Sequence, residues 1–327
     1  MKAIVVLEPG QSSHLEIREL PSAPAGPGEV RVRVGAAGLN RADLLQRLGQ
    51  YPPPRGTAPE ILGLEIAGTV LVSNDPAGCI QEGDRVMALL PGEGYAQEVV
   101  VPSSLCMPVP ERLTLEEAAS IPEVFLTAYD ALFRQIDLRF GETLLIHAAG
   151  SGVGTAALQM AKMAGARTIG TSRHPEKLRR AGELGLDEAI VPTEMDLVEA
   201  VRKLTGGQGV DAILDLVGTT YWPENLEMLR SLGRIIVVGL VSGRKTDLDL
   251  GILLRKRLRL FGTALRSRTV VEKAALIQEF SDHVLPLFSS ARIRPVVDRV
   301  FSWTDAEEAH RYLESNDSFG KVVLSIE

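Results

Sequence analysis

Three features of the sequence predict an α/β fold with two domains. Short strand patterns separated by turns fill residues 1–122, and apolar strand patterns alternate with helical ones over residues 123–267. The remaining segment, 268–327, has mixed character and ends in a strand pattern. A chain of 327 residues is also longer than a single hydrophobic core usually serves. We therefore expect a doubly wound parallel sheet in the middle of the chain and a mostly antiparallel β domain built from the rest.

The first 122 residues read as strands joined by tight turns. Met1–Leu7 is a short apolar run that soon meets Glu8-Pro9-Gly10, so it predicts a first strand rather than a signal peptide. Glu29–Val34 alternates polar and apolar side chains, as a strand with one wet face does. Turn signals such as Pro27-Gly28 and Pro91-Gly92 recur between such runs. This half is typical of a compact antiparallel β domain.

Residues 123–267 follow a strand–helix–strand rhythm. The predicted strands are 143–149, 166–171, 210–216 and 234–240. A helix is expected over 155–164, and a second one opens at Pro175 and stops near Gly185. Alternation at this spacing indicates βαβ units and a parallel sheet covered by helices on both faces.

The last segment is expected to return to the first domain. A helix is predicted near 270–288, followed by an extended stretch over 295–301 and a closing strand over 321–326. A terminal strand of this kind completes an existing sheet more readily than it starts a third domain. The predicted domains are therefore 1–122 with 268–327, and 123–267.

Composition narrows the class of protein. The chain has 35 Lys and Arg against 42 Asp and Glu, a formal charge of −7, which disfavours a dedicated nucleic-acid partner. The basic run Arg255–Arg257 then reads as a solvated face or a dimer rim. No apolar stretch reaches the roughly 18 residues that span a bilayer. The two cysteines, Cys79 and Cys106, form neither a disulfide framework nor a CxxC metal motif, so a soluble cytoplasmic protein is expected.

The most informative segment is the run of small residues from Ala148 to Gly154, between a predicted strand and a helix. It is not a literal GxGxxG, because Ala149, Ser151 and Gly154 take the three motif positions. Small residues there still let a pyrophosphate approach the backbone N–H groups at the start of a helix. The turn, with Gly152 and Val153 inside it, therefore predicts a dinucleotide site. The alternative is a tight turn without ligand.

Charges after the second predicted strand bear on which dinucleotide binds. An NAD site usually places an acid about 20 residues beyond the glycine turn. Here the strand is followed by Ser172, Arg173 and later Lys177, with no acid before Glu176. Cations at a helix start oppose the helix dipole unless an anion lies between them, and the 2′-phosphate of NADPH is such an anion. We predict NADPH over NADH; the alternative is that these cations are solvated surface charges.

Taken together, these segments resemble the zinc-less quinone oxidoreductases of the medium-chain dehydrogenase/reductase superfamily, in particular the branch of the tumour-suppressor-inducible quinone oxidoreductase. The resemblance runs nearly end to end. Beside the small-residue turn it is carried by the strings Leu39-Asn40-Arg41-Ala42-Asp43-Leu44, Gly49-Gln50-Tyr51-Pro52-Pro53-Pro54, Ile61-Leu62-Gly63-Leu64-Glu65, Ala88-Leu89-Leu90-Pro91-Gly92, Ile121-Pro122-Glu123, Leu126-Thr127-Ala128 and Leu265-Arg266-Ser267-Arg268. It implies a GroES-like β domain around an inserted Rossmann domain. It also implies homodimers, and potentially tetramers, joined through Rossmann edge strands, here 257–262.

The resemblance further implies roles for individual residues. It points to Asn40, Tyr51 and Thr127 near the nicotinamide or in the active-site cleft. On the cofactor side it points to Ser151, Gly152, Val153, Lys177, Gly239, Leu240 and Leu265. Tyr51 could stack on a substrate ring or donate a hydrogen bond; alternatively it is a turn tyrosine packed on the following prolines, and Asn40 could simply brace its own loop. One departure is Val191-Pro192, where relatives often have a tyrosine beside the adenosine phosphate, which weakens the expected NADPH preference.

Zinc chemistry is disfavoured. Zinc alcohol dehydrogenases of this superfamily carry a cysteine near position 40 and Gly-His-Glu where this chain has Gly63-Leu64-Glu65, and leucine cannot ligate zinc. The leading hypothesis is therefore an NADPH-dependent quinone oxidoreductase. The second is an NADPH-dependent reductase of an activated C=C in an enone, enal or enoyl substrate. A third is a nucleotide-sensing or structural protein without useful turnover. His147 is interpreted as a satisfied core histidine, and Asp211 and Asp215 as strand-end residues rather than acid–base catalysts.

Overall fold

The computed structural model describes residues 1–10 and 12–327. They divide into two compact units, which we call unit 1, Met1–Leu126 with Leu265–Glu327, and unit 2, Thr127–Ala264. The divisions fall within a few residues of the predicted domain boundaries, at 126/127 and 264/265. Each unit has its own sheet, so the chain leaves the first unit, builds the second, and returns.

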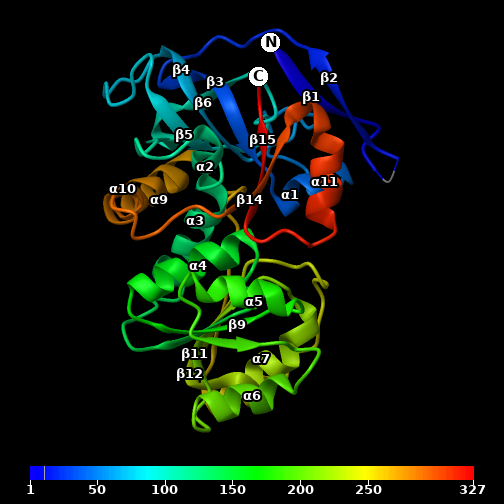
Figure 1. The fold of residues 1–327 in the computed structure, drawn as a ribbon, viewed down its shortest axis with the longest axis vertical. Coiled ribbons are helices and arrows are strands. Elements are labelled where there is room, and N and C mark those ends of the chain that lie inside the picture. The colour runs from blue at the N-terminus through cyan, green and yellow to red at the C-terminus, as the bar shows by residue number, and fades with distance from the viewer. Residues whose placement is uncertain (11) are drawn as a thin grey trace. The chain divides into compact units, whose positions relative to one another are not determined.

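Unit 2 contains the predicted doubly wound parallel sheet (Figure 1). Its six strands lie in the order β10-β9-β8-β11-β12-β13. Their bounds are β8 Thr143–Ile146, β9 Arg167–Thr171, β10 Glu188–Ile190, β11 Val210–Asp215, β12 Leu229–Val237 and β13 Arg259–Gly262. Numbered in chain order this is 3-2-1-4-5-6, the order of a Rossmann sheet. The first three strands are added toward one edge and the last three toward the other, so the order of addition reverses between the parallel neighbours β8 and β11. All six residues of β11 are buried, as a central strand covered on both faces requires.

Helices cover both faces of this sheet, with α4 and α5 on one side of the strands and α6 and α7 on the other (Figure 1). Their bounds are α4 Gly152–Met163, α5 Pro175–Gly182, α6 Leu197–Leu204, α7 Trp222–Met228 and α8 Leu250–Lys256, with a π-helical segment over Asp130–Gln135 and a short 3-10 turn over Thr219–Tyr221. The core beneath α6, α7 and α8 is built from branched side chains of the strands and helices, among them Ile169, Val201, Ile213 and Leu229.

Unit 1 is built on a seven-stranded sheet in the order β14-β15-β3-β4-β5-β7, with β6 also pairing with β3, and on a separate hairpin of β1 and β2. The bounds are β1 Lys2–Leu7, β2 His14–Glu19, β3 Glu29–Gly38, β4 Glu65–Ser73, β5 Arg85–Leu89, β6 Glu98–Pro102, β7 Cys106–Pro108, β14 Val297–Ser302 and β15 Lys321–Ser325. The terminal strand β15 pairs antiparallel with β3, Leu324 opposite Ala37. This confirms that the end of the chain completes the first sheet.

The helices of unit 1 are α1 Arg41–Arg47, α2 Leu115–Ala118, α9 Val270–His283, α10 Leu285–Ser289 and α11 Ala306–Glu314, and α3, Pro122–Tyr129, carries the division between the units; 3-10 turns cover Ser103–Leu105 and Trp303–Asp305. Most of these helices have fewer than ten residues, and α9 has 14. The single helix predicted over 270–288 is wrong, because the chain breaks at Val284 into α9 and α10. Pro286 has no N–H to donate to the preceding turn, and its ring would clash with that turn's carbonyl.

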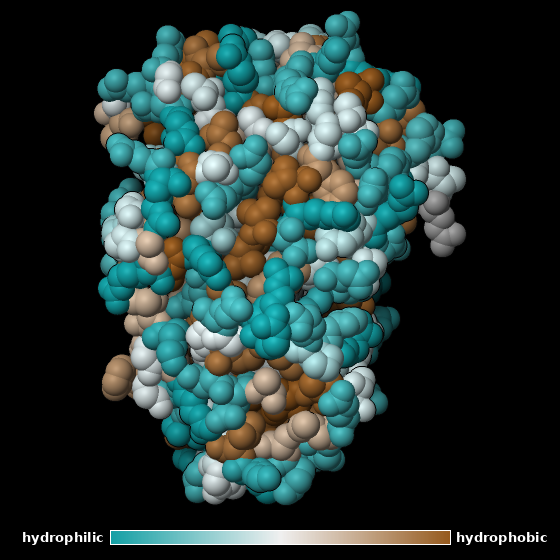
Figure 2. Space-filling model, viewed as in Figure 1, coloured by the Kyte–Doolittle hydropathy of each residue, from teal (hydrophilic) through white to brown (hydrophobic). Residues whose placement is uncertain are grey.

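Hydrophilic side chains cover much of the face drawn in Figure 2. On the face drawn in Figure 2, hydrophobic side chains occur in separate groups among polar ones. Large apolar side chains that reach solvent include Phe140, Leu250 and Leu254. Among the described residues, no helix combines the length and the apolar character that crossing a membrane requires.

The basic run at the end of α8 has a structural use. The Lys256 ammonium donates to three carbonyls at the end of α7 and the start of β12: Leu226 O at 3.0 Å, Glu227 O at 2.7 Å and Leu229 O at 2.7 Å. A helix leaves its last carbonyls without partners and carries partial negative charge there, so a cation stabilises it. Lys256, one of the three consecutive cations, therefore has a role in stabilising the fold.

We expect Lys256→Met to lower the free energy of unfolding by about 1–3 kcal/mol, because three carbonyls lose a charged donor. Urea denaturation followed by circular dichroism measures it. Arg255→Met, which changes an exposed neighbour on the same helix, is the matched control and should change stability little. Equal effects of the two substitutions would contradict this assignment.

Candidate active site

The predicted phosphate turn connects β8 to α4 in unit 2. Ser151 is the N-cap of α4, and its Oγ accepts a hydrogen bond from the Gly154 N–H at 3.1 Å. Residues Ser151–Val153 are partly exposed. The first N–H groups of a helix have no partner inside it, and they carry partial positive charge. The turn therefore presents accessible donors at the carboxyl edge of the sheet, where a pyrophosphate can bind.

Gly154 sets how closely α4 approaches the loop that follows β8. A Cβ at this position would lie 2.5 Å from Ala148 O and 2.7 Å from Ala149 O, which is closer than van der Waals contact allows. Only glycine fits without moving the turn. Gly154 therefore allows the first turn of α4 to pack closely against the loop that follows β8.

A buried polar network lies behind the turn. His147 directly follows β8 rather than lying inside the strand; its Nδ1 is 2.9 Å from Thr171 Oγ1 and its Nε2 is 2.7 Å from Asn225 Oδ1. Asn225 in turn donates to Asp215 Oδ2 at 3.2 Å, while Asp215 Oδ1 accepts the Val217 N–H at 2.8 Å. These contacts confirm that His147 is a satisfied core histidine, and burial lowers its pKa. Asp215 closes the turn after its strand, as expected.

The predicted cations follow β9. Ser172 Oγ accepts the His174 N–H at 3.1 Å, which shapes the turn into α5. Arg173 is exposed, and Lys177 lies in the first turn of α5. Sequence reasoning missed Tyr221, whose ring stacks on His147 at 4.9 Å between centroids. Burial raises the pKa of the Tyr221 hydroxyl, and the Arg173 charge acts against that rise. An aromatic ring therefore shares this edge with Arg173, whereas Val191-Pro192 supplies none.

The remaining predicted cofactor residues lie in different parts of the fold. Gly239 follows β12, which ends at Val237 rather than at the predicted 240, and a Cβ on Gly239 would collide with Leu216 O. Leu240 is 54% exposed, so it is available to a ligand. Thr127 is buried on α3 and belongs to unit 2, whereas Leu265 is buried in unit 1.

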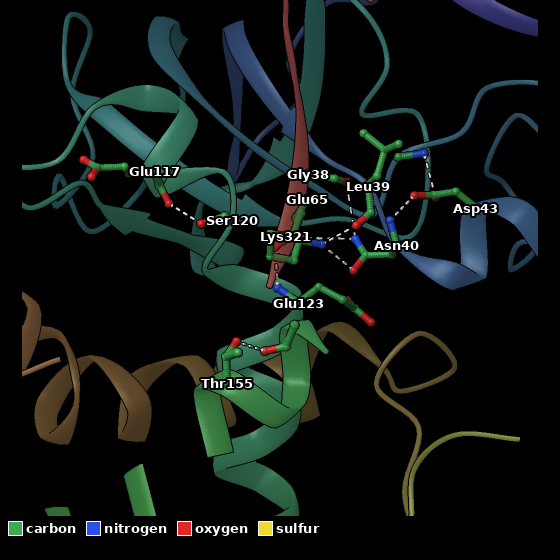
Figure 3. Close-up of polar contacts among 12 residues, drawn as sticks. Gly38, Leu39, Asn40, Asp43, Glu65, Glu117, Ser120, Glu123, Thr155 and Lys321 are labelled. Atoms are coloured by element: carbon green, nitrogen blue, oxygen red, sulfur yellow. Dashed lines mark hydrogen bonds and ion pairs between the residues drawn. The ribbon is translucent and has the colours of Figure 1, made fainter. Parts of the chain in front are cut away.

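Unit 1 holds a buried cluster of charged and polar side chains (Figure 3). Lys321 Nζ, on β15, lies 2.6 Å from Glu65 Oε1, on β4. The same ammonium donates to Asn40 Oδ1 at 2.7 Å and to the Leu39 carbonyl, and Asn40 Nδ2 donates to Glu65 Oε1 at 2.8 Å. Glu65 is fully buried and Lys321 almost so. The predicted site residue Asn40 is thus locked between two strands and α1.

Asp43 extends the cluster. Its Oδ2 accepts the Asn40 N–H at 2.8 Å and the Tyr95 hydroxyl at 3.0 Å, and its Oδ1 accepts the Gly63 N–H at 3.2 Å. Burial raises the pKa of Asp43 to about 6 despite these donors and the Lys321 charge. The Asn40–Asp43 loop is therefore braced, which leaves a role of Asn40 toward a cofactor as a proposal.

Glu123 at the start of α3 is a second residue that sequence reasoning passed over. Its main-chain N–H donates to Glu65 Oε2 at 2.8 Å. Burial first, and then the Glu65 charge, raise the pKa of its carboxyl to about 8. In the sequence, the one visible sign of Glu123 is an acid directly after a proline at the start of a helix. Its raised pKa could not be predicted from that sign, because Glu65 and the other neighbours of Glu123 are remote in sequence.

Tyr51 is held by Arg266. The guanidinium lies over the Tyr51 ring at 5.0 Å and donates from Nη1 to Tyr51 O at 3.0 Å. It also donates to Pro91 O at 2.8 Å and to Gln46 Oε1. Lys273 Nζ on α9 donates to Arg266 O at 3.0 Å. Burial, and next the charge of Glu123, raise the pKa of the Tyr51 hydroxyl. Tyr51 is therefore a positioned side chain that rests on a buried cation.

The side chains that could ligate a metal ion are dispersed among the described residues. In that part of the chain, no group of three or more His, Cys, Asp or Glu side chains could hold a metal ion. Leu64, at the position where zinc relatives have histidine, is buried, and Glu65 is engaged by Lys321. The Glu65 carboxylate thus has a cationic partner from the chain itself.

Comparisons with known proteins agree with the two units. Residues 26–111 match the alcohol dehydrogenase GroES-like domain, and residues 152–282 match the family described as zinc-binding dehydrogenase. A quinone oxidoreductase from Pseudomonas aeruginosa is 34% identical over 311 residues, which cover 95% of each chain. A mycobacterial protein complexed with NADPH superimposes with a TM-score of 0.88 at 31% identity, over 99% of this chain and 100% of that one. The CurK enoyl reductase superimposes with a TM-score of 0.89 at 27% identity, over 100% and 99%.

A GroES-like domain joined to a Rossmann sheet, with a small-residue turn at the edge of that sheet, defines a medium-chain dehydrogenase/reductase. The chain belongs to the quinone oxidoreductase family of this superfamily.

We expect Lys321→Met to lower the free energy of unfolding by about 3–5 kcal/mol, because it leaves the Glu65 carboxylate buried without a cation. Urea unfolding measures it. Adding Glu65→Gln to the same chain removes the unpaired charge and should recover much of the loss. A loss below about 1 kcal/mol in the single variant would contradict the importance of this pair.

Proposed function

We propose that this chain is an NADPH-dependent quinone oxidoreductase that works without zinc and reduces a quinone-like small molecule. One observation carries the nucleotide part: the accessible N-terminus of α4, shaped by Ser151 and Gly154, followed at the next strand by Arg173 and Lys177. The similarity to a quinone oxidoreductase over nearly the whole chain supports the reaction class.

The residues present fit a dinucleotide. The proposed contacts to the pyrophosphate are those of the α4 turn, Ser151–Gly154, and the proposed contacts to the 2′-phosphate are Ser172, Arg173 and Lys177. Asn40, Thr127, Gly239, Leu240 and Leu265 are proposed to line the remainder. The bound cofactor would supply a hydride; the protein orients the two reactants and excludes water. The NADPH complex of a relative at 31% identity supports a phosphorylated cofactor.

A second candidate function is reduction of an activated C=C. The fold likeness to an enoyl reductase, with a TM-score of 0.89, favours it. Both reactions add a hydride to an electron-poor acceptor and leave negative charge on an oxygen. In either case Tyr51 is the proposed contact to the acceptor, by stacking or by donating from its hydroxyl, because Arg266 holds its ring in place.

We also propose a cytoplasmic homodimer joined through the Rossmann edge. β13 is the last strand of the unit 2 sheet and pairs with β12 on one side. An exposed strand edge tends to recruit another chain, and a second copy would satisfy it. The partly exposed Leu260 on this strand would be covered by such pairing.

Replacing Arg173 and Lys177 together with alanine tests the cofactor. We expect KM for NADPH to rise about 10–100-fold, because charged hydrogen bonds to the 2′-phosphate are lost, with little change for NADH. Arg179→Ala removes a cation from the same helix, where it pairs with Glu176, and should leave both values unchanged. Equal rises for the two nucleotides would overturn the NADPH assignment.

Rates of NADPH oxidation with different acceptors test which class of acceptor the protein reduces. The purified protein should oxidise NADPH with a simple quinone faster than with an α,β-unsaturated ketone, and Tyr51→Phe should reduce kcat about tenfold or more if its hydroxyl donates to the acceptor. Fluorescence titration should show unchanged NADPH binding in that variant. A faster rate on the ketone would favour the second candidate. Binding of NADPH without turnover on any acceptor would favour a nucleotide-sensing protein.

A further inference from the structure

The Glu123 carboxyl stands apart from the other acids of the unit 1 cluster. Glu65 and Asp43 have both carboxyl oxygens engaged by donors. Within residues 1–10 and 12–327, neither carboxyl oxygen of Glu123 has a hydrogen-bond or ion-pair partner, and the residue is partly exposed. In Figure 3 its side chain extends away from the Glu65–Lys321 pair, while its main-chain nitrogen faces Glu65. The cluster thus holds Glu123 by its backbone and leaves its acid group available.

The nearby cations are committed to other acceptors. Lys321 donates to Glu65, Asn40 and the Leu39 carbonyl, which uses its three protons. Arg266 is directed at carbonyls and at Gln46. Lys273 donates to Arg266 O, and burial lowers the pKa of its ammonium. Within the described part of the chain, none of these three cations forms a hydrogen bond or an ion pair with the Glu123 carboxyl.

The charged groups around Glu123 come from several elements. Glu65 on β4 and Asp43 on α1 oppose its ionisation, and Lys321 on β15 and Lys273 on α9 favour it. The Tyr51 hydroxyl and the Arg266 guanidinium are also close enough to feel its charge. With burial added, the pKa of about 8 keeps most of the carboxyl protonated at neutral pH. A protonated carboxyl such as that of Glu123, close to the Tyr51 ring that Arg266 fixes in place, is suited to donate a proton.

We propose that Glu123 is the acid that protonates the acceptor when it is reduced. The inference rests on the proposed function and concerns the same site. A hydride brings two electrons and one proton to a quinone and leaves a hydroquinone monoanion. The O–H bond of the Glu123 carboxyl then breaks as a new O–H bond forms on the hydroquinone oxygen. Glu123 is left as a carboxylate and regains its proton from water after product leaves.

The pH profile follows from the sign of the shift. Below about pH 8 the carboxyl holds its proton and can donate it. Above that value the proton is lost, so kcat for a quinone should fall as pH rises. Glu123→Gln has the same shape but cannot donate, so we expect kcat to drop about 10²–10⁴-fold at neutral pH and the alkaline fall to disappear. Glu123→Asp should keep part of the rate and keep a pH dependence.

The experiment measures kcat with NADPH and a quinone from about pH 6 to 10 in the full chain, in these two variants and in Glu111→Gln, a matched control at an exposed acid of unit 1. Fluorescence titration with NADPH checks that each variant still binds. If Glu123→Gln does not fold, the infrared band of a protonated carboxyl, followed against pH in the unmodified protein and in Glu123→Asp, provides a second readout. We expect that band to be lost near pH 8.

The outcomes are separable. A Glu123→Gln chain that binds NADPH and keeps both the full rate and the alkaline fall would overturn this inference alone. An infrared band lost below about pH 5, as for an ordinary carboxyl, would also overturn it. If the unmodified protein itself oxidises no NADPH with any acceptor, the proposed function fails first. Loss of rate and of the alkaline fall together, with binding retained, supports the proton-donor role.

Discussion

Unit 1 depends on one buried ion pair. Lys321 is the first residue of the closing strand, and its contact with Glu65 at 2.6 Å joins β15 to β4 across the sheet. The cost of burying two charges is offset only when the remaining protons and lone pairs also find partners. Asn40 and the backbone N–H of Glu123 provide them. The pair therefore fixes where the Asn40 loop and the start of α3 lie, and with them the residues proposed to act on the acceptor.

The fold of unit 2 could be predicted from sequence because its signals are local. Each parallel strand is a short apolar run, and each helix begins at a proline, serine or aspartate close by. The turn that we propose to bind a pyrophosphate could be predicted for the same reason: its small residues are consecutive, and the cations follow one strand later. The sequence prediction was wrong where a single residue determines an element boundary. The one long helix predicted over 270–288 is interrupted before Pro286 and forms two helices. The strand ending at Val237 was placed too late because its apolar pattern continues past the last ladder contact.

The catalytic half of the candidate site could not be predicted in this way. Lys321 meets Asn40 across 281 positions of sequence, and Arg266 meets Tyr51 across 215. No periodicity or motif indicates such contacts, since they exist only after the closing strand and the segment after β13 return to unit 1. The family resemblance pointed to Asn40 and Tyr51 as site residues. The surroundings of Glu123, Arg266 and Tyr221 became visible only in the folded structure. In unit 2, Tyr221 could not be selected from the sequence for the same reason, because only the folded chain shows that its ring stacks on His147.

The Lys321 ammonium acts on three acids of the cluster, Glu65, Asp43 and Glu123. The three acids differ in their surroundings and therefore in their chemistry. Lys321 contacts Glu65 directly, so Glu65 serves as a fixed charge. Burial raises the pKa of Asp43 to about 6, although three hydrogen-bond donors and the Lys321 charge oppose the rise. Burial, and next the charge of Glu65, raise the pKa of Glu123 to about 8, so Glu123 keeps its proton to a higher pH than Asp43 does. Pairs of carboxyls whose surroundings push their pKa values apart are a recurring way to separate a charged role from an acidic one. In this chain the separation follows from where the closing strand begins, at Lys321. Moving the Lys321 ammonium toward Glu123 would leave Glu65 unpaired and turn Glu123 into a second carboxylate.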